Sequence, residues 1–169
     1  MSTKRVFFGL WPDNRQRDRL RDVINSVARN VEGKAVDRRD WHITLAFLGD
    51  IDEDLIPNLQ ARASQINVEP FRLGFDRLEF WARPKVACLV TATVPTELEK
   101  LVRELNAVMQ EFAVIPKDRT YRPHITVSRS VRAFTTERLA QRATTEWSGF
   151  ELIESVSSPG GVSYVPLKQ

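Results

Sequence analysis

The tripeptide His-Ile-Thr occurs twice in this sequence, within HITLAFLG (residues 42–49) and within HITVSRS (residues 124–130). The chain has no other histidine. Both stretches alternate apolar and polar residues, which is typical of a strand with one buried face. Because successive side chains of a strand point to opposite faces, each histidine shares a face with the threonine two residues later. The aliphatic residues form the core face, so each His/Thr pair is expected to point away from the core.

A strand and a helix precede each His-Ile-Thr stretch, which predicts two copies of one structural unit. In the first copy, RVFFGLWP (5–12) predicts a strand, and apolar residues at helical spacing predict a helix over about 13–31. In the second copy, KVACLVTATVP (85–95) predicts the strand, and a similar apolar stripe predicts a helix over about 96–112. The start of the strand lies 37 residues before the histidine in the first copy and 39 in the second.

Both helices have candidate capping boxes at their starts. Asp13 is followed three residues later by Gln16, and Thr96 is followed three residues later by Glu99. This spacing lets the two residues of each pair hydrogen-bond each other's backbone N–H groups. We therefore expect the helices to begin at Asp13 and Thr96.

The remaining segments predict further helices and strands in an α+β protein. They are a helix over about 53–66, two short strands within 70–81, a short helix over about 135–143 and a terminal hairpin with arms 151–158 and 161–167. No low-complexity segment or Gly/Ser linker interrupts the chain. Residues 1–169 are therefore expected to form a single domain with two similar lobes.

The composition fits a small globular protein. The chain has 169 residues, of which 42% are hydrophobic and 28% are charged, and its formal net charge is +3. No apolar run approaches the ~18 residues that a membrane helix needs. A single cysteine, Cys88, cannot form an internal disulfide, which fits a cytoplasmic protein. Two histidines and one cysteine exclude a Cys/His zinc site of ordinary spacing. We expect no metal and no cofactor. We also expect a monomer, because no surplus apolar stripe is evident.

Two imidazoles facing each other across a groove between the lobes would suit the cleavage of a phosphodiester. This reaction needs a base for the attacking oxygen and an acid for the leaving oxygen, and imidazole can serve as either near neutral pH. The hydroxyls of Thr44 and Thr126 could donate hydrogen bonds to the phosphate oxygens that gain charge in the transition state. A lone histidine in a strand is usually structural. The equal placement of both motifs favours catalysis.

Basic and aromatic residues gather near both motifs, namely Arg38, Arg39, Arg119, Arg122, Arg129, Phe47 and Tyr121. A guanidinium matches the geometry of a phosphate, and an aromatic ring can stack on a nucleobase. Regular alternation places Arg129 on the face opposite His124, so the strand would have to end or bend after Ser128 for Arg129 to reach a phosphate. The same alternation places Phe47 on the core side of its strand.

HITLAFLG and PHITVSR resemble the paired H-x-T-x motifs of the 2H phosphoesterase superfamily. RVFFGLWP and SSPGGVSYVPL (157–167) are similar to its RNA 2',3'-cyclic phosphodiesterase branch, also called 2'-5' RNA ligases. The resemblance spans nearly the whole chain. It implies a bilobal α+β fold, in which two pseudo-symmetric lobes with antiparallel sheets surround a central cleft and the helices lie outside.

The resemblance also implies an activity, the hydrolysis of a 2',3'-cyclic phosphate RNA end to a 2'-phosphate without a metal. Such RNA ends, including tRNA-derived ones, are the expected partners. Matching positions imply roles as proton donor for His42, as proton acceptor for His124, and in phosphate binding for Thr44, Thr126 and Arg129. Phe47 matches an aromatic residue of the first motif, and Tyr121 and Arg122 are expected to contact the base or substrate.

Alternatives within and outside this class stay open. An enzyme of the same superfamily could act on a small cyclic nucleotide, or could seal 2'-5' RNA junctions in the reverse direction. A protein of another class could be a catalytically silent module that binds RNA or a nucleotide. A binding module has no need for both histidines and both threonines, so the enzymatic interpretation is preferred.

Overall fold

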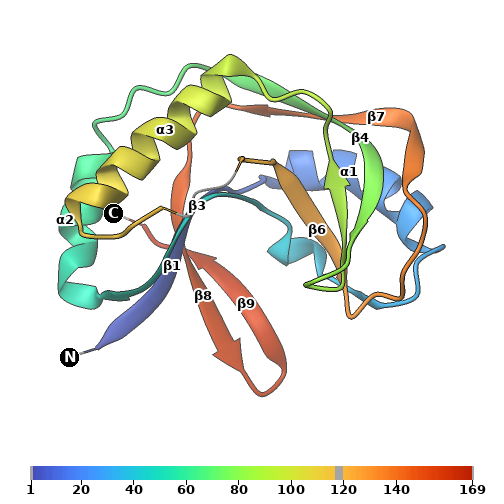
Figure 1. Ribbon diagram of the computed structural model, residues 1–169, viewed down its shortest axis with the longest axis horizontal. Coiled ribbons are helices and arrows are strands. Elements are labelled where there is room, and N and C mark those ends of the chain that lie inside the picture. Colours follow the sequence, from blue (N-terminus) through green and yellow to red (C-terminus); the bar gives the residue numbers. More distant parts are fainter. Residues whose placement is uncertain (1, 117–119, 169) are drawn as a thin grey trace.

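The computed structural model describes residues 2–116 and 120–168 and contains two antiparallel sheets (Figure 1). Arg119 lies outside the described residues. The first sheet has four strands in the order β3 (Ile43–Asp52), β1 (Thr3–Leu10), β8 (Glu151–Ser158) and β9 (Gly161–Pro166). The second sheet has five strands in the order β2 (Lys34–Ala35), β6 (His124–Arg129), β5 (Val86–Val90), β4 (Phe71–Trp81) and β7 (Glu137–Trp147).

The strands of the two predicted copies pair in the same way. The first motif strand, β3, pairs with β1, which begins the first copy. The second motif strand, β6, pairs in the same way with β5, which begins the second copy. On their other sides β1 and β5 pair with β8 and β4. Each motif strand thus lies beside the first strand of its own copy, although β3 is an edge strand and β6 also pairs with β2.

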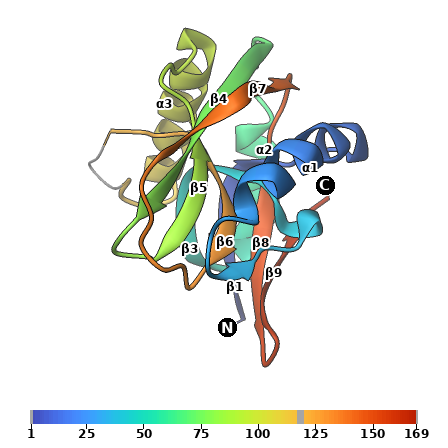
Figure 2. The ribbon, with the colours of Figure 1, turned by 90° about the vertical axis from the view of Figure 1, so that its right-hand side faces the viewer.

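Each of the helices α1 (Asn14–Ala28) and α3 (Thr96–Glu111) packs against the sheet of the other copy. Helix α1 follows β1 of the first sheet but packs against β7 and β6 of the second. Helix α3 follows β5 of the second sheet but packs against β3 of the first, beside α2 (Ile56–Ala63). Figure 1 shows α1 and α3 on opposite sides of the molecule, and Figure 2 shows them from the side. The two lobes therefore interlock.

One hydrophobic core connects both sheets and all three α-helices. The fully buried side chains Leu20 of α1 and Leu105 of α3 belong to the same cluster as Phe8 of β1 and Phe75 of β4. Because each helix covers the sheet of the other copy, neither copy has a complete core of its own. The exchange explains why a sequence without linkers folds around one core.

The expected helix over 135–143 is wrong, because this segment belongs to strand β7. The residues Glu137 to Ala143 include good helix formers, but β7 pairs along β4 and completes the edge of the second sheet. Near its end Ala143, Thr145 and Trp147 are buried in alternation, as a strand requires. Cross-strand pairing and burial therefore override the local preference for a helix.

Several boundaries also differ from the sequence prediction. The segment 70–81 forms one strand, β4, with a register irregularity at Asp76, instead of two strands. The capping box between Asp13 and Gln16 is confirmed. The expected box at Thr96 is wrong, because the N-cap of α3 is the preceding residue, Pro95, and no side chain caps the helix.

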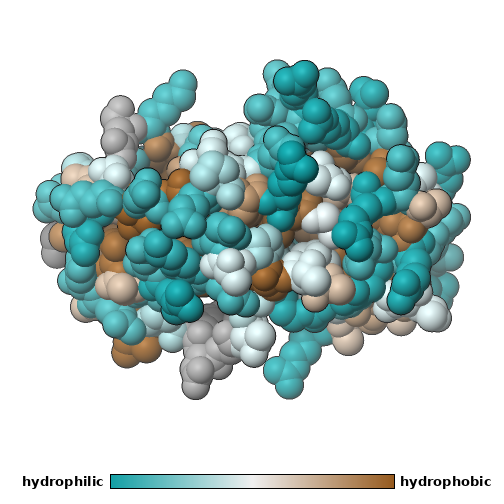
Figure 3. Space-filling model, turned by 90° about the horizontal axis from the view of Figure 1, so that it is seen from above, coloured by the Kyte–Doolittle hydropathy of each residue, from teal (hydrophilic) through white to brown (hydrophobic). Residues whose placement is uncertain are grey.

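Hydrophilic residues dominate the face seen in Figure 3, with hydrophobic residues in small separate patches. The exposed large hydrophobic residues of the described chain are Phe47, Leu55, Ile115, Val162 and Val165. No helix among the described residues is long and apolar enough to cross a membrane.

The interlocked helices predict that the protein unfolds in one cooperative step. Leu20→Ala removes a buried side chain of α1 that lies in the shared core, and should cost about 2–5 kcal/mol of unfolding free energy. Urea unfolding should give coincident transitions by far-UV circular dichroism and tryptophan fluorescence, in the wild type and in the variant. Two separate transitions, with only one of them shifted by the substitution, would show that the lobes fold independently.

Candidate active site

A β-bulge interrupts each motif strand one residue after its threonine. The register of β3 with β1 skips Leu45 and, further on, Leu48. The register of β6 with β5 skips Val127. A bulge adds one residue to one strand of a pair, so the alternation of side chains changes beyond it. In both strands the side chains therefore switch faces one residue after the threonine, at Leu45 and at Val127.

The bulges turn Phe47 and Arg129, each five residues after its histidine, toward the histidine face. Phe47 is 37% exposed and pairs with Phe7, whose ring centroid lies 5.0 Å from that of His42. The Arg129 guanidinium donates a 2.8 Å hydrogen bond to the hydroxyl of Tyr164, and the Tyr164 ring lies 4.4 Å from that of His42. The faces expected from regular alternation are therefore wrong for both residues.

The backbone holds both imidazoles in the same way. Nδ1 of His42 lies 2.7 Å from the carbonyl oxygen of Asp40, and Nδ1 of His124 lies 2.9 Å from the carbonyl oxygen of Arg122. A carbonyl oxygen can only accept, so Nδ1 carries the proton in both rings. Nε2 is then the nitrogen of each ring that can take or give a proton in a reaction.

The charges of the two motifs act on each other. Burial lowers the pKa of His42 to about 4, against the opposing effect of the hydrogen bond to the Asp40 carbonyl. The positive charges of His124 and Arg129 lower this pKa further. The structure thus brings together both histidines and the arginine, on β3 and on β6. At neutral pH His42 is therefore uncharged before an anion binds.

Aromatic rings surround His42. Besides Phe7 and Tyr164, Trp11 lies nearly parallel to the imidazole, with a ring distance of 6.3 Å and an angle of 20°. These rings restrict the imidazole and exclude water from its faces. They explain why burial is the largest influence on its pKa.

Tyr164 of β9 connects the two motifs. Its ring lies against His42 and its hydroxyl accepts the hydrogen bond from Arg129. Its backbone N–H also lowers the pKa of the Asp40 carboxylate, against the larger effect of burial, and the carbonyl of Asp40 holds His42. The terminal hairpin therefore completes the site. Sequence analysis assigned no role to Tyr164, although the alternation of the hairpin arms could have placed it on a face of β9.

A polar network lies behind His124. The ring of Trp81 is 4.3 Å from that of His124, and Arg122 lies 5.2 Å over the Trp81 ring. Glu79 accepts hydrogen bonds from Arg122, from Trp81 and from Arg77, at 2.9, 3.1 and 2.9 Å. Burial alone would raise the pKa of Glu79, but these hydrogen bonds lower it below its usual value. Glu79 thereby fixes the Trp81 ring and Arg122 beside His124.

The threonines and Tyr121 occupy different positions relative to the core. Thr44 and Thr126 are half-buried between the buried aliphatic residues of their strands, as expected. The Thr126 hydroxyl lies 3.7 Å from the thiol of Cys88 on the neighbouring strand. Tyr121 packs against the hydrophobic core, and its hydroxyl donates a 2.9 Å hydrogen bond to the carbonyl of Thr44. It therefore links the loop before the second motif to the strand of the first.

A model of the 2'-5' RNA ligase superfamily matches residues 12–153. The chain belongs to this superfamily. It is 26% identical to the RNA 2',3'-cyclic phosphodiesterase of Archaeoglobus fulgidus, over 97% of this chain and 98% of the relative. It is 28% identical to the Escherichia coli protein of the same name, over 81% of this chain and 78% of the relative. These matches confirm the family that the paired motifs indicate.

Solved structures share the fold. The crystal structure of E. coli LigT complexed with 3'-AMP matches with a TM-score of 0.87 at 26% identity, covering 99% of this chain and 97% of that chain. The complex of the same protein with phosphate matches with a TM-score of 0.83, covering 99% and 96%. The α+β fold with two antiparallel sheets is therefore confirmed.

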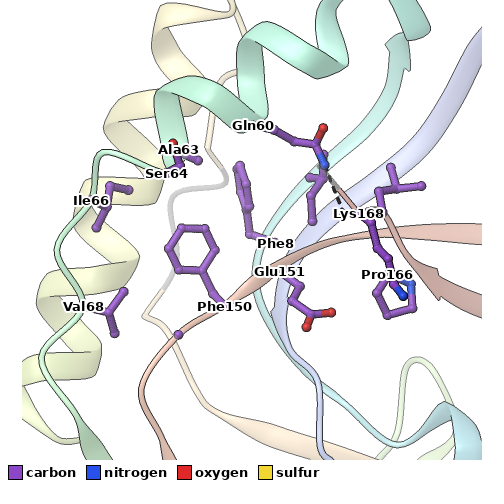
Figure 4. A pocket seen from close by; sticks show the side chains of 13 residues that line it. Phe8, Gln60, Ala63, Ser64, Ile66, Val68, Phe150, Glu151, Pro166 and Lys168 are labelled. Carbon is purple, nitrogen blue, oxygen red and sulfur yellow. Dashed lines mark hydrogen bonds between the residues drawn. The ribbon is translucent and has the colours of Figure 1, made fainter.

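A separate cavity of about 480 Å³ lies away from both motifs, between α2 and the ends of β8 and β9 (Figure 4). Its lining includes Phe8, Phe150 and Ile66, and Gln60 bridges it with a hydrogen bond to the carbonyl of Leu167. No residue of either His-Ile-Thr motif lines it.

Among the described residues, no three His, Cys, Asp or Glu side chains come together as metal ligands would.

The contact between Tyr164 and Arg129 predicts a positioning effect on anion binding. Tyr164→Phe keeps the ring beside His42 but removes the hydroxyl that holds Arg129, so inorganic phosphate should bind roughly 2- to 10-fold more weakly, as for the loss of one ordinary hydrogen bond. Calorimetry on Tyr164→Phe, Arg129→Gln and the double variant measures this. The double variant should bind no more weakly than Arg129→Gln alone. Additive losses would show that Tyr164 acts independently of Arg129.

Proposed function

We propose that this protein is an RNA 2',3'-cyclic phosphodiesterase, which opens a terminal cyclic phosphate and leaves a 2'-phosphate. The observation that carries the proposal is the pair of imidazoles held alike through Nδ1 and close enough to interact electrostatically. Arg129 beside them supplies a positive charge for a phosphate. The names of the relatives from A. fulgidus and E. coli support the choice of substrate.

In the proposed reaction, His124 acts as the base and His42 as the acid. Water attacks phosphorus from the side opposite O3', and Nε2 of His124 takes a proton from the water. The P–O3' bond breaks, and O3' takes the proton from Nε2 of His42. The hydroxyls of Thr44 and Thr126 and the Arg129 guanidinium would hold the two non-bridging oxygens, where charge accumulates in the transition state. This division of roles follows the matching positions of the family motifs.

Because the pKa of His42 is low, His42 can act as the acid only if the bound substrate raises this pKa and the imidazole becomes protonated. Because its pKa is about 4, His42 carries no proton on Nε2 at neutral pH. A unit negative charge about 4 Å from the ring contributes about 4 kcal/mol at an effective dielectric constant near 20, equivalent to a pKa change of about 3. A bound phosphodiester can thus raise the pKa of His42 to near neutrality. The acid would be charged only when there is a leaving group to protonate.

The superfamily name favours ligation as a second candidate function. Joining a 2',3'-cyclic phosphate end to a 5'-hydroxyl forms a 2'-5' linkage with the same groups. His124 would then take its proton from the 5'-hydroxyl instead of from water. Hydrolysis and ligation differ only in the attacking oxygen, so one site can support both.

The proposed function predicts the product of a direct assay. EDTA-treated protein should convert an oligonucleotide with a 2',3'-cyclic phosphate end into one with a 2'-phosphate, as identified by the gain of one water in mass spectrometry and by chromatography against synthetic 2'- and 3'-phosphate standards. His42→Gln and His124→Gln should each lower kcat by about 10²- to 10⁴-fold, the usual contribution of a general acid or base. Arg19→Gln, on the exposed side of α1, is the control. A 3'-phosphate product, or a histidine variant with wild-type turnover, would overturn the assignment.

If a bound anion promotes the protonation of His42, the pKa of His42 should change when phosphate binds. In phosphate-free protein its imidazole should titrate with a pKa of about 4, and saturating inorganic phosphate should raise this value toward neutrality. NMR spectra of the ring carbons measure both values, and the His42→Gln variant assigns the signals. A pKa that stays near 4 when phosphate is bound would exclude His42 as the acid, and would favour it as the base.

A further inference from the structure

Trp11 and Arg17 extend the site beyond His42, where β1 continues into α1. The ring of Trp11 lies nearly parallel to the His42 imidazole, at 6.3 Å. The guanidinium of Arg17 lies over the Trp11 ring, 5.2 Å from its centroid. Arg17 is also close enough to Asp40, which precedes the first motif, for their charges to interact. One aromatic ring therefore separates this guanidinium from the imidazole.

The charge of Arg17 is only partly compensated, by Asp13 and Asp40. The guanidinium is half-buried, and its buried Nε has no hydrogen-bond partner among the residues that the structure describes. Neighbouring arginines differ, because Arg38 and Arg21 form ion pairs with Asp18. Burial lowers the pKa of Arg17, and the charge of Arg38 lowers it further. A half-buried cation in this state costs free energy unless an anion binds it.

Two carboxylates lie near Arg17. Asp13, the N-cap of α1, accepts a hydrogen bond from the N–H of Gln16, and Asp13 and Asp40 both raise the pKa of Arg17 against the effect of burial. Neither carboxylate forms an ion pair with Arg17 among the residues that the structure describes.

We propose that Trp11 and Arg17 form a second phosphate site, which binds the phosphodiester on the 5' side of the terminal nucleotide. This inference rests on the proposed function, because a cyclic phosphate occupies the 3' end of an RNA and any further phosphate lies on its 5' side. A guanidinium that lies over an aromatic ring still has N–H groups in its own plane that can donate to a phosphate. The preferred substrate is then an RNA strand, not a mononucleotide.

The experiment compares two substrates that differ by one phosphodiester. Adenosine 2',3'-cyclic phosphate lacks the second phosphate, and the dinucleotide ApA ending in a 2',3'-cyclic phosphate has it. Arg17→Gln should lower kcat/KM for the dinucleotide by about 10- to 100-fold more than for the mononucleotide, as expected for loss of a charge-assisted hydrogen bond. Arg19→Gln removes the same charge from an exposed position of the same helix and should leave the preference unchanged.

Salt dependence gives an independent measurement. In the wild type, the affinity for the 2'-phosphate-ended dinucleotide should fall more steeply with salt than that for adenosine 2'-phosphate. Arg17→Gln should reduce the slope of the logarithmic plot for the dinucleotide by about 0.7, the value for one phosphate contact on a single strand. The slope for adenosine 2'-phosphate should stay the same.

The outcomes separate this inference from the proposed function. Equal losses on both substrates would show that Arg17 acts through His42, and no loss on either would show that it binds no phosphate; both overturn the second site. If the wild type turns over neither substrate, the proposed function fails. The binding measurements then still decide whether Arg17 distinguishes the dinucleotide from the mononucleotide.

Discussion

The composition of the site depends on a one-residue irregularity in each motif strand. A regular strand shows every second residue to one side, so β3 would present Ala46 after its threonine and β6 would present Ser128. The bulges present Phe47 and Arg129 in their place. A methyl group and a small hydroxyl are thereby replaced by an aromatic ring and a guanidinium, at equivalent places on two equivalent strands. The irregularity is as much a part of the repeated unit as the His-Ile-Thr tripeptide.

The two histidines have the same backbone geometry but different surroundings. Each holds its Nδ1 against the carbonyl two residues earlier. His42 is enclosed by the rings of Phe7, Trp11 and Tyr164. His124 instead lies beside Trp81, which contacts the charged residues Arg122 and Glu79. Any division of labour between acid and base must come from these neighbours, because the motifs themselves are alike. A bound anion would also act on His42, because its negative charge opposes the effect of burial on the pKa of this residue.

The sequence was sufficient to predict what depends on local pattern. Alternation located the motif strands and the terminal hairpin, and spacing revealed the duplication. Residues far apart in the sequence decide the rest. Strand β7 forms because β4 offers an edge, against the helical preference of residues 137–143. The bulges cannot be detected from the alternation of apolar and polar residues, so this alternation places Phe47 on the wrong face. Tyr164 reaches His42 only because β9 is the fourth strand of its sheet, which composition and spacing do not reveal.

The exchange of helices explains how two separate sheets can keep a reactive geometry. Were each helix to cover its own sheet, the lobes could separate at the cost of a few contacts. Instead α1 and α3 cross to the opposite sheets and share one core, and Tyr121 and Tyr164 add hydrogen bonds between the motifs. Moving the sheets apart would expose core residues of both lobes. The relative position of the two imidazoles is thus set by the packing of the whole chain.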